Sequence, residues 1–513
     1  MSEKTERVHF IFKQSHINMS DSKSITATPR VYLLTVLAFA VGLVFNYLFF
    51  DKLPGVSVVI FVAIVIALTL WLCQRHGMSY RAGLWLMGGA LVFSLCVMVR
   101  DNGFLSFLNI LATLGLLLLA IRSVMRERVI DFRLPDYLKT IFWLPFKILR
   151  RSLEAISLLF RPGQNSPAGR RTSVIKGIVM ALPFLVIFGL LFASADAAFK
   201  QFFTSIFTFT IPDTVFGHLV FIVGPFVISL GVWALLFINS ATKKSAPITE
   251  STTSLPVGSR SLETSIFLWL IAALFLVFII FQVAYLFGGA ANITAAGFTY
   301  AEYARRGFWE LLIVAFITLL LLLVTDFYTQ RSLPRLKWFT LPSLVLIGEI
   351  FIIMTSSFKR LMLYQSAYGL TTLRLYVAGF IIFLAVIFAL LALKLWREKR
   401  DSFFALGALL AMIAFLLSFN LLNPDNFITR QNVARFGQTG AIDMEYLASL
   451  RSADAVPALL DVYGRLPKEV QEPLFGSLEM ITQRLEKDAT HWESFNISRR
   501  AALIQLREEF KKQ

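Results

Sequence analysis

The sequence has few of the residues that build disulfide-rich or metal-binding folds. It contains two cysteines and five histidines in 513 residues, and only 16% of its residues are charged. Both cysteines, Cys73 and Cys96, lie inside apolar runs, where a free thiol behaves as a small hydrophobic side chain. The histidines are scattered without the spacing of metal ligands. The sequence therefore predicts no disulfide framework and no metal site, and we expect no cofactor.

Nucleotide-binding motifs are also missing. There is no Gly-x-x-x-x-Gly-Lys-Ser/Thr phosphate loop, and no kinase or ATPase core follows the apolar segments. Residues 1–30 are polar and lack a short apolar core with a cleavage site, so we predict a polar amino-terminal segment without a signal peptide. These absences argue against a primary pump or a sensor kinase.

What the sequence has in abundance is apolar residues in long runs. They make up 57% of the chain, and the mean hydropathy is +0.70. The runs approach the roughly 20 residues needed to cross a bilayer, and a crossing segment must be helical so that its backbone is hydrogen-bonded internally. We therefore predict an all-α, polytopic transmembrane helical bundle with a small carboxyl-terminal helical soluble domain.

About eleven spans are expected, in two groups. Four of them form an amino-terminal bundle over residues 31–121, and seven form a second bundle over residues 178–422. The predicted spans are Val31 to Phe50, Val56 to Cys73, Ala82 to Val99, Phe104 to Ile121, Ile178 to Ala198, Thr214 to Ile238, Ser265 to Phe287, Phe308 to Thr325, Trp338 to Ser356, Leu375 to Trp396 and Ser402 to Leu422.

A basic segment, residues 122–177, separates the two groups. It holds twelve Lys/Arg against four Asp/Glu, so the positive-inside rule makes it cytoplasmic. Its stretch from Tyr137 to Phe160 mixes apolar and basic residues, as a helix on an anionic leaflet would, although Pro145 is expected to interrupt any single helix there. A basic connector packed on the spans is the alternative. Eleven spans then put the amino terminus in the cytoplasm and the carboxyl terminus outside it.

The tail, residues 423–513, is the one long polar stretch. It carries twelve Lys/Arg and thirteen Asp/Glu, so the chain's formal charge of +17 belongs to the membrane part and nucleic-acid binding is not expected. Apolar residues at helical spacing predict helices at Ala455 to Tyr463, Pro467 to Lys487 and Ser498 to Lys511. We expect a small helical domain that could meet a protein partner.

Charged residues near lipid are costly and therefore candidates for function. With the predicted topology, polar residues from four distant segments face the extracytoplasmic side, and we expect them to form one cluster, with Arg374 the first choice for an anion site. For their role, we favour headgroup anchors and interhelical ion pairs that hold the bundle together over a functional site. The candidates are Asp196, Glu302, Tyr303, Arg306, Glu310, Arg360, Tyr364, Tyr368, Arg374, Asn423 and Asp425.

Glu349 lies near the middle of a predicted span. An isolated carboxylate there has to be protonated or paired, and we expect it to face the bundle rather than lipid. It is the residue that most favours a proton or ion pathway.

Several of these segments match the hallmarks of a known family. They are the span ending at Asp196, the element from Tyr303 to Glu310, the element from Arg360 to Arg374, Asn423-Pro424-Asp425, and Tyr446-Leu447 followed by Asp454-Ala455-Val456-Pro457. In these, the chain from about Ile178 to its end resembles an uncharacterised bacterial family of multi-pass membrane proteins, known only as a domain of unknown function. The resemblance implies the bacterial inner membrane and supplies no mechanism.

Three functions remain open on the sequence. The first, which we favour, is a non-enzymatic envelope scaffold or signalling partner. The second is a secondary transporter that uses Glu349 and the charges at the outer mouth. The third is a membrane enzyme acting on a lipid-linked substrate, with Asp196 or Glu302 as acid or base and Arg360 or Arg374 holding phosphate. No catalytic constellation is visible, so we do not predict an enzyme.

Overall fold

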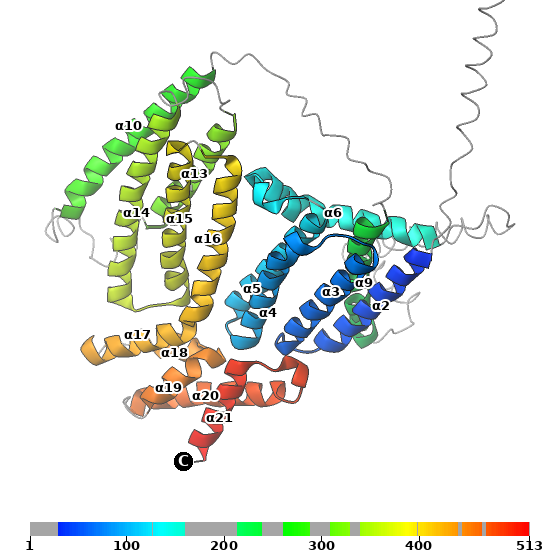
Figure 1. Ribbon diagram of the computed structural model, residues 1–513. Helices are drawn as coiled ribbons and strands as arrows, with labels where there is room; N and C mark the ends of the chain where they lie inside the picture. The colour runs from blue at the N-terminus through cyan, green and yellow to red at the C-terminus, as the bar shows by residue number, and fades with distance from the viewer. Residues whose placement is uncertain are drawn as a thin grey trace, which may run out of the picture. The chain divides into compact units, whose positions relative to one another are not determined.

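The computed structural model describes residues 29–125, 127–159, 213–238, 260–287, 308–328, 339–397, 399–439, 444–463 and 468–511, and every regular element in these ranges is a helix. Ten of the described helices are long and apolar enough to cross a membrane. The predicted all-α, polytopic bundle is therefore confirmed, and the protein is a multi-pass membrane protein (Figure 1).

The ten helices match ten of the eleven predicted spans. The remaining one, Ile178 to Ala198, lies outside the described residues. The observed helices are α2 (Pro29–Phe49), α3 (Val56–Arg75), α4 (Leu84–Val99), α5 (Gly103–Val124), α9 (Asp213–Phe237), α10 (Arg260–Phe287), α13 (Phe308–Tyr328), α14 (Leu341–Tyr368), α15 (Thr372–Trp396) and α16 (Asp401–Leu422).

Short polar signals end these helices where the sequence places them. The side chain of Asn102 accepts the backbone N–H of Leu105 and so caps α5, and Thr371 caps α15 in the same way. Asn423 ends α16 in the left-handed region at φ +55°, directly before Pro424. Gly369, at φ +81°, allows the tight turn between α14 and α15.

The chain divides into two compact units, and the first comprises residues 1–50 and 145–243. Within it α2 packs closely on α9, because Gly42 has no side chain: a Cβ there would overlap the carbonyl oxygen of Ile222. His218 stacks on Phe50 with ring centroids 3.7 Å apart and contacts the Asn46 amide oxygen at 2.9 Å.

The second unit comprises residues 51–144 and 244–513. In it α3, α4 and α5 pack in sequence, and α14 packs against α10, α13 and α15. One apolar core joins α10 and α13 to α16 through residues such as Leu322, Ile350 and Phe388, which are fully buried. The predicted domain boundaries, including the four-span bundle over residues 31–121, stay a prediction.

Helix α6 (Leu134–Leu159) corrects one expectation from the sequence, because it runs through Pro145 as a single helix. Proline removes one backbone hydrogen bond, and the apolar contacts of the buried face, at Leu144 and Ile148, offset that loss. Its opposite face leaves Phe142 and Phe146 more than 60% exposed. An exposed apolar stripe beside lysines and arginines is the pattern of an interfacial helix.

The tail folds as a small helical domain at the carboxyl-terminal end of α16 (Figure 1). It contains α17 (Pro424–Thr439), α18 (Met444–Ser449), α19 (Val456–Tyr463), α20 (Lys468–Asp488) and α21 (Ile497–Phe510). The last three match the three predicted tail helices. Val456, Leu478, Leu503 and Leu506 belong to a core of its own, separate from that of the membrane helices. We call residues 424–511 the tail domain.

Candidate functional site at the contact between the tail domain and the membrane helices

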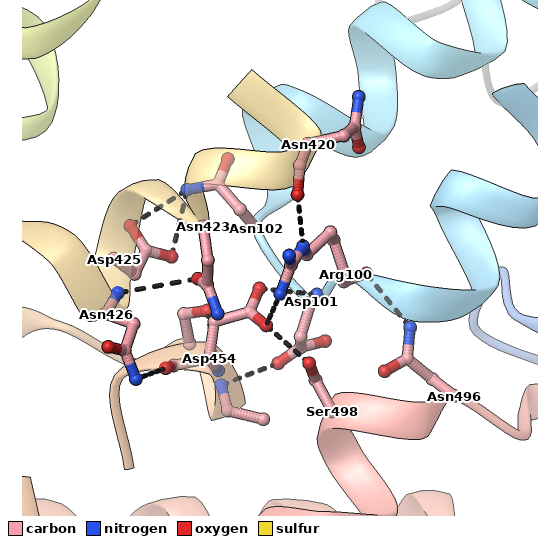
Figure 2. Close-up of polar contacts among 12 residues, drawn as sticks. Arg100, Asp101, Asn102, Asn420, Asn423, Asp425, Asn426, Asp454, Asn496 and Ser498 are labelled. Carbon is pink, nitrogen blue, oxygen red and sulfur yellow. Dashed lines mark hydrogen bonds and ion pairs between the residues drawn. The ribbon is translucent and has the colours of Figure 1, made fainter. Parts of the chain in front are cut away.

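A group of mostly buried polar residues lies where the tail domain meets the ends of the membrane helices. It is built on the turn Arg100-Asp101-Asn102 between α4 and α5, which points its polar groups at the tail (Figure 2). We call the group the tail-contact cluster. Its members are Arg100, Asp101, Asn102, Asn420, Asp425, Asp454, Arg484, Asn496, Ser498 and Arg499.

Asp101 is the hub of this cluster. Its carboxylate accepts hydrogen bonds from Arg499 Nε at 2.5 Å, from Arg484 Nη2 at 2.7 Å and from the backbone N–H of Ala453 at 2.9 Å. The Asp101 side chain is only 2% exposed. Two arginines and one amide therefore neutralise and solvate a carboxylate that has lost its water.

Asp454 makes the reciprocal contact from the tail domain. Its carboxylate accepts the backbone N–H of Asp101 at 2.8 Å and the Ser498 hydroxyl, and Arg100 Nη1 lies 3.8 Å away. Burial raises the pKa of the Asp454 carboxyl above its ordinary value, while these hydrogen bonds and the arginine oppose the rise. The two aspartates thus cross-link the α4–α5 turn and the loop before α19.

Asp425 lies at the start of α17 and forms no ion pair with an arginine among the described residues. Asn102 Nδ2 donates to both of its carboxylate oxygens, at 3.0 and 2.9 Å. Burial is the main cause that raises the pKa of the Asp425 carboxyl, and the charge of Asp101 adds to it. Asp425 is therefore held by neutral donors in a buried place, where a charge is costly.

Asparagines complete the contact. Asn496 caps α21 through its Oδ1 and donates through Nδ2 to the carbonyls of Val97 and Arg100, at 3.0 and 2.9 Å. Asn109 and Asn420 exchange two amide hydrogen bonds of 2.8 Å between α5 and α16. Each of these amides satisfies a backbone or amide group that would otherwise be buried without a partner.

A second contact joins the tail domain to the turn between α14 and α15. Asn432 of α17 accepts the backbone N–H of Leu370 at 2.7 Å and donates to the Leu370 carbonyl at 2.8 Å. The Tyr446 hydroxyl of α18 accepts the Thr372 N–H at 2.7 Å. The tail domain is therefore hydrogen-bonded to two separate turns at one end of the second unit.

The residues proposed from the sequence fall into three groups. Asp196, Glu302, Tyr303 and Arg306 lie outside the described residues. Asn423 and Asp425 lie at the tail-contact cluster. Glu310 is exposed in the first turn of α13, and within the described residues it forms no hydrogen bond or ion pair with either turn.

Arg360, Tyr364, Tyr368 and Arg374 lie on the α14–α15 hairpin. Arg374 lies over the Tyr364 ring, with Cζ 4.2 Å from its centroid, and donates to the carbonyls of Tyr368 and Gly369. Its guanidinium thus closes the hairpin. Arg360 is 8% exposed and has a buried Nε.

Glu349 is 8% exposed on α14, and its Oε2 has no hydrogen-bond partner among the described residues. The Glu349 side chain is thus packed among the helices of the second unit, as expected for a carboxyl group, which is costly to expose to lipid. Among the described residues, no three His, Cys, Asp or Glu side chains come close enough to hold a metal ion.

Two sets of polar residues escaped the sequence reasoning. The first is the hub, in which Asp101 precedes Arg484 by 383 residues and Arg499 by 398 residues along the chain. The second lies near the other ends of α13 and α15, where the buried Lys394 pairs with Asp326 and, at 2.8 Å, with Asp401. A charge within two residues of a span end, as at Asp101 or Asp326, was the signal that could have identified them.

Comparison with known proteins gives one match. A family model described as Domain of unknown function (DUF4153) matches residues 87–462, well over half of the chain. No curated protein and no solved structure matches. The match begins in α4, earlier than the segments that suggested the resemblance, and it includes both turns that hold the tail domain as well as Asp425 and Asp454. The protein is thus a multi-pass membrane protein that belongs to the DUF4153 family.

Proposed function

We propose that the protein is a non-enzymatic membrane scaffold that presents its tail domain to a protein partner on one side of the membrane. The observation that carries this proposal is the hydrogen bonding of the tail-contact cluster. Asp101 and Asp454 each accept several hydrogen bonds from donors within the chain. These carboxylates therefore hold the tail domain in place and are not free to bind a substrate. An acid or base in catalysis has to reach the proton that it transfers.

The hairpin arginine also supports a scaffold over a lipid-modifying enzyme. Arg374, the first choice for holding a phosphate, donates to two carbonyls of its own hairpin and stacks on Tyr364. A phosphate would have to displace these bonds. The tail domain has in addition its own core and exposed apolar residues, Met480 at 53% and Ile504 at 46%, which a partner could cover.

We propose the bacterial inner membrane as the location, with the amino terminus in the cytoplasm and the tail domain outside it. Arg100 Nε donates to the Asn420 carbonyl at 2.7 Å, so the start of α5 and the end of α16 lie at the same membrane face. That requires an even number of crossings from α5 to α16. The described residues supply seven: α5, α9, α10, α13, α14, α15 and α16. One more is needed, and the sequence predicts it at Ile178 to Ala198.

The basic segment supports anionic lipid as a partner on the cytoplasmic side. Helix α6 carries Lys139, Lys147 and Arg150 beside its exposed apolar face, where they can reach anionic headgroups while Phe142 and Phe146 enter the interface.

The scaffold proposal is tested by photo-cross-linking in cells. A cross-linking amino acid is placed at Met480 or Ile504 in the tail domain and, as a control, at the exposed Met412 in α16. We expect a discrete protein adduct from the tail positions that disappears when Asp101→Ala weakens the tail contact, and none from Met412. No adduct from either tail position would contradict the proposal.

A secondary transporter is the second candidate, and Glu349 is what favours it. Its Oε2 is buried in a span and accepts no hydrogen bond from any residue that the structure describes, as in a proton-carrying group. Glu349→Gln keeps the shape and removes the titration, whereas Glu349→Leu also removes the polar group. If both variants fold and complement a deletion strain as the wild type does, transport through Glu349 is refuted. If both variants fold but fail to complement, while Asp101→Ala complements, the transporter proposal replaces the scaffold proposal.

A further inference from the structure

The loop between α20 and α21 lies directly on the ends of two membrane spans. The Phe495 carbonyl accepts the N–H of Val56, the first residue of α3, at 2.8 Å. Lys52 pairs with Glu493 at 2.6 Å, and Asn496 binds the last turn of α4. A Cβ at Gly55 would overlap the Phe495 carbonyl oxygen, so the two backbones are in close contact.

The depth of this loop follows from the length of α3. The helix has 20 residues, which at about 1.5 Å per residue gives roughly the thickness of the hydrocarbon core. Val56 therefore lies at the boundary of the hydrocarbon, and the residues bonded to it lie at headgroup level. There the loop exposes Trp492 at 55%, Phe495 at 46% and Ile497 at 45%. Aromatic residues of this kind are typical of the membrane interface.

A pocket of about 250 Å³ opens beside these aromatic residues, between the end of α20 and the start of α21. Asp488, Trp492, Phe495 and Arg500 line it, together with Arg499, which is already engaged by Asp101. The Asp488 Oδ2 is buried and has no hydrogen-bond partner among the described residues. Arg500 is exposed and forms no ion pair with any residue in the described part of the chain. The pocket is thus lined by a carboxylate with one oxygen that no described residue hydrogen-bonds, and by a cation that forms no ion pair among them.

We propose that this pocket binds the headgroup of a phospholipid that carries a primary ammonium beside its phosphate, as phosphatidylethanolamine does. The phosphate would accept from the Arg500 guanidinium, and the ammonium would donate to the Asp488 carboxylate, which turns its buried Oδ2 toward the pocket. The acyl chains would leave past Trp492 and Phe495 into the bilayer. A trimethylated headgroup has no N–H to donate, and a headgroup with phosphate alone leaves Asp488 facing an anion. The bound lipid would tie the tail domain to the membrane surface.

Native mass spectrometry of the full chain tests this proposal, with ethanolamine, choline and glycerol phospholipids of identical acyl chains. We expect about tenfold higher occupancy by the ethanolamine lipid than by the choline lipid, the effect of one charge-assisted hydrogen bond. Asp488→Asn should abolish that preference, and Arg500→Gln should weaken all three lipids. Arg507→Gln, the same charge change on α21 outside the pocket, is the control and should change nothing.

The ratio of two lipids on one variant is independent of how well the variant folds. Equal occupancy by the ethanolamine and choline lipids on the wild type would overturn the proposal. Tightest binding of the glycerol lipid would do so too, since it would indicate an anion site, as would an ethanolamine preference that survives Asp488→Asn.

Discussion

Replacing Asp101 by alanine removes the one carboxylate that two arginines of the tail domain share. Removing one partner of a buried ion pair costs about 3–5 kcal/mol, because the other charge stays buried. Most of this free-energy cost comes from Arg499, whose side chain is 13% exposed and would stay buried as an unpaired charge. The Arg484 side chain is 38% exposed, so water can solvate it and its share of the cost is smaller. The Ala453 N–H also loses its acceptor.

We expect the tail contact to weaken by about 4 kcal/mol, which is roughly a thousandfold in its equilibrium constant. Hydrogen exchange of the full chain in nanodiscs measures this. Amides of α19 and α21 should exchange much faster in Asp101→Ala, while amides within α4 and α5 keep the protection of their spans.

Arg507→Ala is the matched control. Arg507 pairs with Glu486 at 2.9 Å in the same domain, but both side chains are about half exposed, so the loss should be below about 1 kcal/mol. A double-mutant cycle between Asp101→Ala and Arg499→Ala should show a coupling above about 1.5 kcal/mol. Unchanged exchange in α21 of Asp101→Ala would refute the role of Asp101 as the hub.

Three further predictions concern the same face of the protein. Asn496→Ala removes the cap of α21 and the two hydrogen bonds to the carbonyls of Val97 and Arg100. The free energy of opening the first turn of α21, measured by hydrogen exchange, should fall by about 2 kcal/mol, and a change confined to other helices would contradict this. Because the pKa of the Asp425 carboxyl is raised in the folded state, the folded state binds this proton more tightly than the unfolded state does. The contribution of Asp425 to the stability of the tail contact should therefore grow as the pH falls from 7 toward the unfolded pKa of about 3.9. Thermal melts of wild type and Asp425→Asn isolate that contribution, and identical pH slopes would refute it. Reporter fusions should score residues 122–177 as cytoplasmic and a fusion after Gln513 as extracytoplasmic, and a cytoplasmic score at Gln513 would remove the eleventh span.

The sequence by itself determined the fold class and the limits of the spans. Runs of about 20 apolar residues can only be helices in lipid, and Gly55 and Asn423 mark helix limits. Nine predicted spans agree with the described helices within about five residues, whereas α14 continues twelve residues beyond the predicted end at Ser356. The tail helices were equally predictable, because their apolar spacing is local. Local chemistry was less decisive at Pro145, where packing kept α6 continuous.

Only the tertiary structure decided which polar groups meet. Asp101 and Arg499 are 398 residues apart, and no local pattern links a charge at a span end to an arginine in a soluble helix. Arg374 has no acid nearby in sequence, which suggested a free anion site, yet the left-handed turn at Gly369 brings two carbonyls and the Tyr364 ring to its guanidinium. Hydrophobic periodicity fixes where each helix lies along the chain, whereas the partners of buried charges depend on how distant helix ends come together.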